Sequence, residues 1–335
     1  MKLVTYEFWG SVRSGVIVGD WVVDLERGYE RVLQGRQASG ADRQAAGLLP
    51  PTLKGVLEGG AKSLGAAKDV VIEARLAFDQ GENSWQAAGA ATPLAHVRLW
   101  PPIPNPDKII CMGLNYRAHA EEGGEAVPDA PELFAKFANA LIGQDWPIQL
   151  PRISNEVDYE AELAVVVGSR ARDVSVDEAL DYVAGYTIFH DVSARDVQLR
   201  TSQWLAGKGM DTFAPMGPWI VTTDEIADPQ ILQIKLELGG QVLQNANTST
   251  MVRTVREAVS FISQVMTLEP GDVISTGTPD GVGFARKPPI YLRGGDVVKI
   301  TIDGIGTLSN PVIGPPADRR PVGAPATQLE GVKRM

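Results

Sequence analysis

An uninterrupted apolar run, LAVVV at residues 163–167, follows two glutamates that stand two residues apart. Apolar side chains on both faces predict a strand in the interior of the molecule. Glu160 and Glu162 then lie on one face of this strand, roughly 7 Å apart. Two carboxylates on a buried surface repel each other and lose their hydration, so the fold must supply protons, basic partners or a cation.

The composition describes a globular chain with enough apolar residues for a core, because 44% of its 335 residues are hydrophobic and 21% are charged. Length alone allows two or three domains. The sequence has no run of about 18 apolar residues and no signal-peptide core near its start, so we expect neither a membrane span nor a secretory leader. The single cysteine, Cys111, fits a reducing cytoplasm. A net charge of −10 argues against nucleic-acid binding but leaves room for an anionic small substrate at a local positive site.

Glycine and proline residues divide the chain into three predicted parts. Short apolar runs around the turn Gly19-Asp20 predict a small antiparallel sheet, and a helical stretch follows up to residue 95. The proline-rich residues 100–106 predict a stiff, extended connector. We therefore expect an N-terminal α+β domain at 1–100, a second domain at 101–314 and a polar tail at 315–335.

Two helices are predicted in the second domain. The first covers residues 173–185, because Ser175 and Glu178 have capping-box spacing. The second covers residues 252–266, where apolar residues recur at helical spacing. Its expected N-terminal cap is one of two hydroxyl residues, Ser249 or Thr250.

A predicted strand at residues 186–191 adds a third carboxylate, Asp191, to Glu160 and Glu162. All three offer oxygen atoms, and the chain has no paired cysteines and only three histidines. This donor set favours a hard cation, Mg²⁺ first and then Mn²⁺ or Ca²⁺. The alternative is a pair of strand-edge glutamates that face solvent. His190 is expected on the opposite face of its strand from Asp191, as a packed core residue.

His119 and Glu122 share a face if residues 116–122 form a short helix. The pair Gly123-Gly124 then leaves this segment free to fold over a site. A histidine oriented by a glutamate can act as a general base. The alternative is a purely structural histidine, which is the commoner case for a single histidine on a helix.

Two glycine-rich segments carry further candidates. Lys208 stands between Gly207 and Gly209, where its ammonium can reach a substrate carboxylate or a developing oxyanion. The alternative is an exposed loop lysine. The segment TGTPDGVG at residues 276–283 lacks the Lys-Ser/Thr ending of a phosphate-binding loop, so we reject a nucleotide site and keep Thr278 as a hydroxyl donor to substrate.

Taken in order, these segments resemble the fumarylacetoacetate hydrolase family. The resemblance spans about residues 101–313, and residues 1–100 look like the variable N-terminal domain that some members carry. It rests on GLNY at 113–116 with His119 and Glu122, DYEAEL at 158–163, DVSARDVQ at 191–198, KGMDT at 208–212 with Gly217-Pro218, PGD at 270–272 with TGTP at 276–279, and GIG at 304–306 with Asn310.

The resemblance implies a mixed α/β fold, built as a mixed β-sandwich roll with flanking helices, and a homodimer. It implies that the three carboxylates bind Mg²⁺ or Mn²⁺ and that His119 and Glu122 form a water-activating dyad on a lid. His190 is a departure, because asparagine often precedes the metal-binding aspartate in this family, so the surroundings of that ligand differ. Around a small anionic 2-oxo acid substrate the resemblance places Tyr116, Arg195, Gln198, Lys208 and Thr278.

We therefore predict a metal-dependent hydrolase that cleaves a carbon–carbon bond of an acylpyruvate-like substrate in the catabolism of aromatic compounds. In this reaction His119 activates water and Lys208 stabilises negative charge. The alternatives are an isomerase or decarboxylase of a 2-hydroxy-dienedioate and an oxaloacetate decarboxylase, which need no attacking water. A non-enzymatic, metal-stabilised binding protein is the third class, and a closed site without open coordination positions would mark it.

Overall fold

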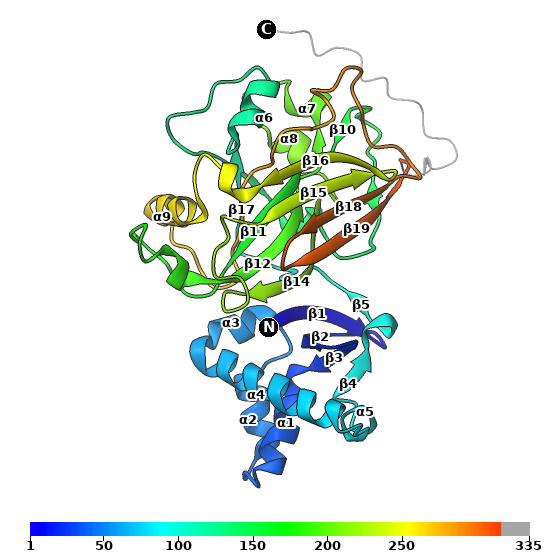
Figure 1. Ribbon diagram of the computed structural model, residues 1–335, viewed down its shortest axis with the longest axis vertical. Helices are drawn as coiled ribbons and strands as arrows, with labels where there is room; N and C mark the ends of the chain where they lie inside the picture. The colour runs from blue at the N-terminus through cyan, green and yellow to red at the C-terminus, as the bar shows by residue number, and fades with distance from the viewer. Residues whose placement is uncertain (316–335) are drawn as a thin grey trace, which may run out of the picture.

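The computed structural model of the protein describes residues 1–315 (Figure 1). The polar tail predicted at 315–335 lies, from residue 316 on, outside the described residues. A smaller group of strands and most of the long helices fill the lower part of Figure 1, and longer strands fill the upper part. The predicted mixed α/β architecture is confirmed.

The first hundred residues form a small sheet with helices packed beside it (Figure 1). The β2–β3 hairpin turns through Gly19, whose φ of 58° suits glycine, and this confirms the predicted Gly19-Asp20 turn. The strands are β1 (Lys2–Phe8), β2 (Ser11–Val18), β3 (Trp21–Asp24), β4 (Ala91–Pro93) and β5 (Arg98–Leu99). The helices are α1 (Leu25–Gly35), α2 (Ala41–Leu48), α3 (Leu53–Glu58), α4 (Gly60–Asp79), α5 (Ser84–Ala87) and the 3₁₀ turn η1 (Leu94–His96).

One large sheet continues from this part into the rest of the chain, in the order β4-β3-β2-β1-β14-β12-β11-β17-β6-β7. The join is antiparallel, with Leu3 of β1 opposite Ile220 of β14. The predicted domain division at residue 100 stays a prediction. The further strands are β6 (Ile109–Gly113), β7 (Glu132–Lys136), β8 (Leu141–Ile142), β11 (Ala161–Val167), β12 (Val183–His190), β14 (Ala214–Thr222) and β17 (Val273–Ser275).

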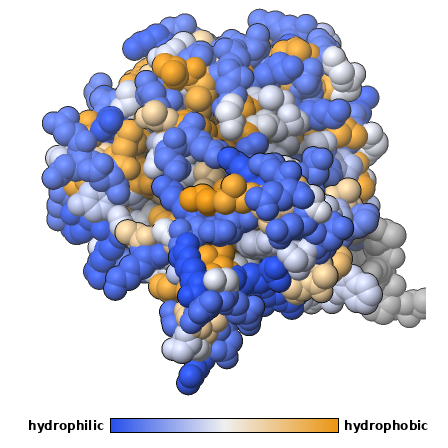
Figure 2. Space-filling view, turned by 60° about the horizontal axis from the view of Figure 1, so that its bottom comes forward, coloured by the Kyte–Doolittle hydropathy of each residue, from blue (hydrophilic) through white to orange (hydrophobic). Residues whose placement is uncertain are grey.

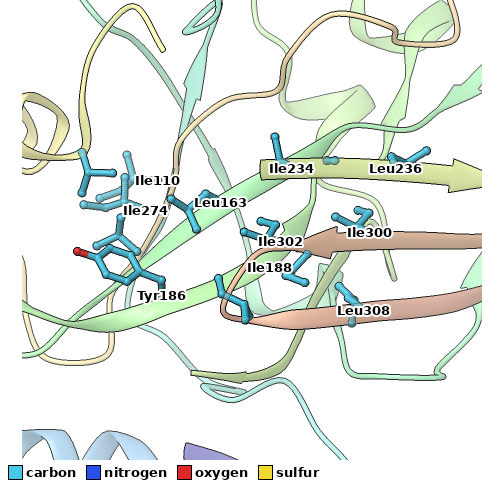
Figure 3. Close-up of a cluster of buried hydrophobic side chains, with 14 of the residues drawn as sticks. Ile110, Leu163, Tyr186, Ile188, Ile234, Leu236, Ile274, Ile300, Ile302 and Leu308 are labelled. Carbon is cyan, nitrogen blue, oxygen red and sulfur yellow. The ribbon is translucent and has the colours of Figure 1, made fainter. Parts of the chain in front are cut away.

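A second sheet, in the order β16-β15-β18-β19-β9, packs against the centre of the first. Figure 3 shows its isoleucines and leucines beside those of β11, β12 and β17. Its strands, with the separate pair β10 and β13, are β9 (Ile148–Gln149), β15 (Gln233–Leu238), β16 (Gln241–Asn247), β18 (Val297–Ile302), β19 (Gly306–Ile313), β10 (Val157–Asp158) and β13 (Ser193–Ala194).

Strand β11 separates two hydrophobic cores and is buried along its whole length. Leu163 and Val165 belong to the core shared with the second sheet. Ala164 and Val166 belong to the core that reaches the N-terminal helices. The prediction of an interior strand, apolar on both faces, is thereby confirmed.

The helix predicted over residues 173–185 is wrong. Only the 3₁₀ turn η3 (Ala179–Tyr182) forms there, and β12 already begins at Val183. Ser175 and Glu178 do hydrogen-bond to each other, with the Ser175 hydroxyl 2.7 Å from the Glu178 carboxylate. The local signal is real, but pairing of β12 with β11 and β14 fixes the following residues as strand, so tertiary contacts override it.

The remaining helices are short except one. That helix, α9 (Val255–Val265), is capped at its N-terminus by Thr254 rather than by the predicted Ser249 or Thr250. Thr254 and Glu257 form a complete capping box, and the two earlier hydroxyl residues lie in or beside a 3₁₀ turn. The short elements are α6 (Arg117–Glu122), α7 (Arg195–Gln198), α8 (Leu205–Lys208), η2 (Ala138–Ala140) and η4 (Thr248–Thr250).

Hydrophobic and hydrophilic residues are mixed on the face shown in Figure 2, where the hydrophobic ones form small separate groups. Among residues 1–315, no helix combines the length and apolar character needed to cross a membrane.

The capping box of α9 gives a stability prediction. Thr254→Ala removes the hydroxyl that accepts the Glu257 N–H, so we expect the free energy of unfolding to fall by about 1 kcal/mol. Chemical denaturation measures the change. Ser249→Ala is the matched control, because Ser249 is exposed and lies outside the box, and an equal loss in both variants would contradict this cap.

Candidate active site

The strand pair β11–β12 brings three carboxylates together. Ala161 of β11 pairs with His190 of β12, and the Asp191 N–H donates to the Glu160 carbonyl oxygen at 3.0 Å. Glu160, Glu162 and Asp191 are all buried, and each offers an oxygen within 4.8 Å of the others. The three residues singled out in the sequence therefore meet at one point at the end of β11.

Two of these carboxylates are ion-paired. The Lys208 ammonium lies 2.7 Å from Glu160 Oε2 and 2.6 Å from Asp191 Oδ2. A guanidinium nitrogen of Arg195 lies 2.6 Å from Glu160 Oε1. Burial alone raises the pKa of Glu160, but Lys208 and Arg195 outweigh it and hold that pKa well below its usual range. Glu160 is thus a stable anion.

A second lysine, Lys136, was missed in the sequence. It lies fully buried on β7, with its ammonium 2.5 Å from Asp191 Oδ1 and 3.0 Å from the Val192 carbonyl oxygen. Burial lowers its pKa, and the neighbouring Lys208 lowers it further. The only available signal was its place directly after the apolar residues 133–135, which is weak evidence for a buried cation.

Glu162 stands apart because no cation pairs with it in the described chain. Its Oε2 accepts hydrogen bonds from the Ser275 hydroxyl and from the Gly277 N–H, the latter at 2.9 Å. Burial, together with the negative charges of Asp191 and Glu160, raises its pKa well above the usual range. Neither hydrogen bond uses Oε1, and Glu162 lines a cavity. An unpaired, buried carboxylate is therefore directed at an open space.

These residues fit a divalent cation. The donor set is three carboxylate oxygens with no sulfur, as hard cations prefer. Four buried acids, including Asp158, lie beside three buried cations, Lys136, Arg195 and Lys208, so one acid, Glu162, is left without a cationic partner among the described residues. A cation held by Glu160, Glu162 and Asp191 would remove the repulsion that raises the pKa of Glu162.

A glycine places Lys208 at this cluster. Helix α8 packs so closely on α7 that a Cβ at Gly207 would lie 2.5 Å from Cβ of Gln198 and 2.7 Å from the Ala194 carbonyl oxygen. Only glycine permits this approach, which carries the next residue, Lys208, between two carboxylates. The predicted glycine flanks thus serve close packing, and the alternative of an exposed loop lysine is wrong because Lys208 is buried.

The predicted dyad is formed. On α6, His119 Nδ1 lies 3.0 Å from Glu122 Oε1. Glu122 is itself fixed, because its Oε2 accepts the Gly281 N–H at 2.8 Å. With the ring proton on Nδ1 donating a hydrogen bond to the Glu122 carboxylate, the other ring nitrogen, Nε2, has a lone pair with which to act as a base.

A cavity of about 150 Å³ joins the dyad to the carboxylates. Phe134, Trp204 and Phe284 form apolar parts of its wall. A cavity of this size holds a molecule about as large as benzene. The predicted residues that line it are His119, Glu160, Glu162, Arg195, Gln198, Lys208 and Thr278.

Three further residues singled out in the sequence have surroundings that bear on their predicted roles. The Thr278 hydroxyl donates to the Ala161 carbonyl oxygen at 3.0 Å and accepts from Gln244, so its proton is already used. Tyr116 lies in the hydrophobic core and does not line the cavity, and its buried hydroxyl has no hydrogen-bond partner among the described residues. His190 is buried, as predicted, and burial with the nearby Lys136 lowers its pKa to about 3. The chemical roles of all site residues remain predictions.

The opposite charge environments of Glu160 and Glu162 predict opposite effects of removing one charge. In metal-free protein, Glu162→Gln removes a buried carboxyl group whose ionised form has no cationic partner, so we expect the melting temperature to rise by a few degrees, which corresponds to roughly 1 kcal/mol of stability. Glu160→Gln leaves Lys208 and Arg195 short of a partner, so we expect a loss of roughly 3 kcal/mol.

Thermal melts with and without MgCl₂ measure both variants. The wild-type protein should gain stability with Mg²⁺, and neither variant should gain as much. Equal effects of the two substitutions in metal-free protein would contradict the charge assignment.

Comparison with known proteins identifies the family of the chain. Residues 108–313 match the model of the fumarylacetoacetate (FAA) hydrolase C-terminal family. The chain is 45% identical over 245 residues to a Xenopus laevis protein named oxaloacetate tautomerase fahd2, mitochondrial, which covers 70% of this chain and 77% of that protein. It is 51% identical over 231 residues to a fumarylacetoacetate hydrolase domain-containing protein 2 homolog of Dictyostelium discoideum, which covers 66% and 75%.

Solved structures point the same way. A fumarylacetoacetate hydrolase from Exiguobacterium antarcticum superposes with a TM-score of 0.75 at 34% identity, covering 94% of this chain and 99% of that one. A maleylpyruvate hydrolase from Sphingobium, solved with manganese(II) and pyruvate, gives 0.66 at 30% identity, covering 94% and 100%. With the family model matched over most of the chain, the protein belongs to the fumarylacetoacetate hydrolase family.

Proposed function

We propose that the protein catalyses keto–enol isomerisation of a short 2-oxo dicarboxylic acid, with oxaloacetate as the leading candidate. The observation that carries the proposal is the cavity, which is small and joins one oriented histidine to a cluster of buried charges. Relatives more than 40% identical are named oxaloacetate tautomerases, which supports the same choice. The predicted alternatives to hydrolysis were an isomerase or decarboxylase of a 2-hydroxy-dienedioate and an oxaloacetate decarboxylase. The relatives' names favour the isomerase class, with oxaloacetate in place of the dienedioate.

The reaction moves one proton. His119 Nε2 takes the proton from C3, the C3–H electron pair forms the C2–C3 double bond, and the C2–O π pair moves onto the oxygen. The imidazolium then gives its proton to that oxygen, which yields the enol and restores the neutral imidazole. Glu122 orients the ring and stabilises the imidazolium that forms. In the reverse direction the imidazolium returns the proton to C3.

Cations of the chain bind and stabilise the anionic substrate. Lys208 lies in the cavity wall and stabilises the negative charge that develops on the C2 oxygen. Arg195 lines the same cavity and provides a guanidinium for a carboxylate of the substrate. A divalent cation, Mg²⁺ or Mn²⁺, held by Glu160, Glu162 and Asp191 would supply Lewis-acid polarisation of the 2-oxo group.

Hydrolysis of an acylpyruvate is the second candidate, because the same dyad can activate water. The Sphingobium neighbour that is named a maleylpyruvate hydrolase supports it. The two reactions differ in what His119 deprotonates, which is substrate carbon in the isomerase and water in the hydrolase. The two reactions also need different cavity volumes, since the hydrolase must hold a water molecule and a longer substrate together.

The assay compares the two reactions directly. The enol and keto forms of oxaloacetate differ in ultraviolet absorbance, so we expect the Mg²⁺-supplemented protein to speed their interconversion. His119→Ala should lower kcat/KM by about 10²–10⁴-fold, the usual contribution of a general base. His96→Ala is the control, because His96 lies exposed on η1. Cleavage of acylpyruvates without isomerisation of oxaloacetate would favour the hydrolase and overturn the proposal.

The homodimer and the cytoplasmic location remain proposals. The dimer follows from the family resemblance, and light scattering of the purified protein tests it. The single, buried Cys111 fits a reducing compartment. Several vertebrate relatives, from Xenopus laevis and Homo sapiens among others, are named mitochondrial, so cell fractionation must distinguish cytoplasm from an organelle.

A further inference from the structure

Four successive backbone N–H groups, at residues 281–284, point at two different carboxylates. Gly281 and Val282 donate to Glu122, at 2.8 and 3.4 Å. Gly283 and Phe284 donate to Asp158, at 2.7 and 3.0 Å. One loop therefore holds the glutamate of the dyad with its first half and a second acid with its other half.

The second acid, Asp158, is completely buried and does not line the cavity. Besides the two loop bonds, its Oδ1 accepts the Tyr159 N–H at 2.8 Å and its Oδ2 accepts Nε–H of Arg195 at 2.9 Å. It thus fixes the guanidinium of Arg195, whose other nitrogens reach Glu160 and Gln198. Asp158 acts on the site through the residues that it holds.

Close packing confines the loop to this path. A Cβ at Gly283 would lie 1.9 Å from the Ile290 carbonyl oxygen and 2.5 Å from Asp158 Oδ1. A Cβ at Gly281, whose φ is 97°, would lie 2.2 Å from the Leu243 carbonyl oxygen. The backbone therefore lies against its neighbours at both glycines, with no room for a side chain at either.

Phe284 gives a second connection between the same parts. Its ring lies under the Arg195 guanidinium, 4.5 Å from ring centre to Cζ. Its Cζ atom also lies 3.6 Å from the Cβ position of Gly123, at the end of α6. Helix α6 and Arg195 therefore share both a hydrogen-bonded loop and one aromatic ring.

We propose that Asp158 is a positioning residue that couples the dyad helix α6 to Arg195 through residues 281–284. When Asp158 holds the loop, Glu122 keeps its backbone donors and His119 keeps its orientation, while Arg195 stays aimed into the cavity. The inference rests on the proposed function for what His119 and Arg195 do with substrate. The coupling itself needs no turnover to be observed.

Hydrogen–deuterium exchange on the full-length, metal-free protein tests the coupling. Asp158→Asn keeps the size of the side chain and removes its charge. We expect the amides of Ala120 and Glu125, which are hydrogen-bonded within and just after α6, to exchange about tenfold faster. Among the residues that the structure describes, none in α6 bonds to Asp158, so a purely local role would leave these amides unchanged.

A matched control is Asp196→Asn, since Asp196 adjoins Arg195 but accepts its side-chain hydrogen bond from Ser154. It should leave exchange in α6 at the wild-type rate. Strands β15 and β18 of the second sheet report global loosening. If they also exchange faster in Asp158→Asn, the test passes to Glu122→Gln, which should speed exchange at Gly283 and Phe284.

The possible results distinguish coupling from a purely local role of Asp158. Faster exchange confined to residues 195 and 283–284 in Asp158→Asn, or no change at 283–284 in Glu122→Gln, would overturn the coupling. In turnover assays, the fold-loss of kcat/KM in the double variant Asp158→Asn, Glu122→Gln should be smaller than the product of the losses in the two single variants, because both residues act through one loop. A strictly multiplicative loss would also overturn it. Failure of the oxaloacetate assay alone would overturn the proposed function and leave the exchange result standing.

Discussion

An excess of buried acidic groups over buried cations is the constraint on which this structure depends. Glu160, Glu162, Asp191 and Asp158 lie where water cannot solvate them, and within residues 1–315 three buried cations face them. Three of the four acids are ion-paired, and the raised pKa of Glu162 shows that its ionised form is disfavoured without a further cation. Such an arrangement costs stability in the free protein. The arrangement is useful if a bound cation supplies the missing positive charge and keeps coordination positions open for a substrate.

The rest of the fold keeps these charges in place. Strand β11 is buried on both faces between two hydrophobic cores, so the glutamates at its start cannot turn toward solvent. The close contact at Gly207 holds Lys208 against the acids. The loop at residues 281–284 holds the dyad beside them. Stability of the cores thus supports a local arrangement that is unfavourable by itself.

Sequence reasoning succeeded where one residue type had one physical meaning. The unbroken run of apolar residues correctly predicted the interior strand. The two acids at the start of that strand correctly predicted a carboxylate cluster with Asp191. It failed over residues 173–185, where a true Ser175–Glu178 signal was overridden by pairing of β12 in the sheet. Lys136 and the loop bonds of Asp158 were beyond its reach, because partners up to about 125 residues away along the chain determine them.

The most direct test of the account is the position of a bound cation. Crystals grown with Mn²⁺ allow its anomalous scattering to locate the ion. The account predicts one peak within coordination distance of Glu160, Glu162 and Asp191, with at least one further position open toward His119 and the cavity. A protein that binds no Mn²⁺ at this cluster, or an ion enclosed by protein ligands on every side, would contradict it.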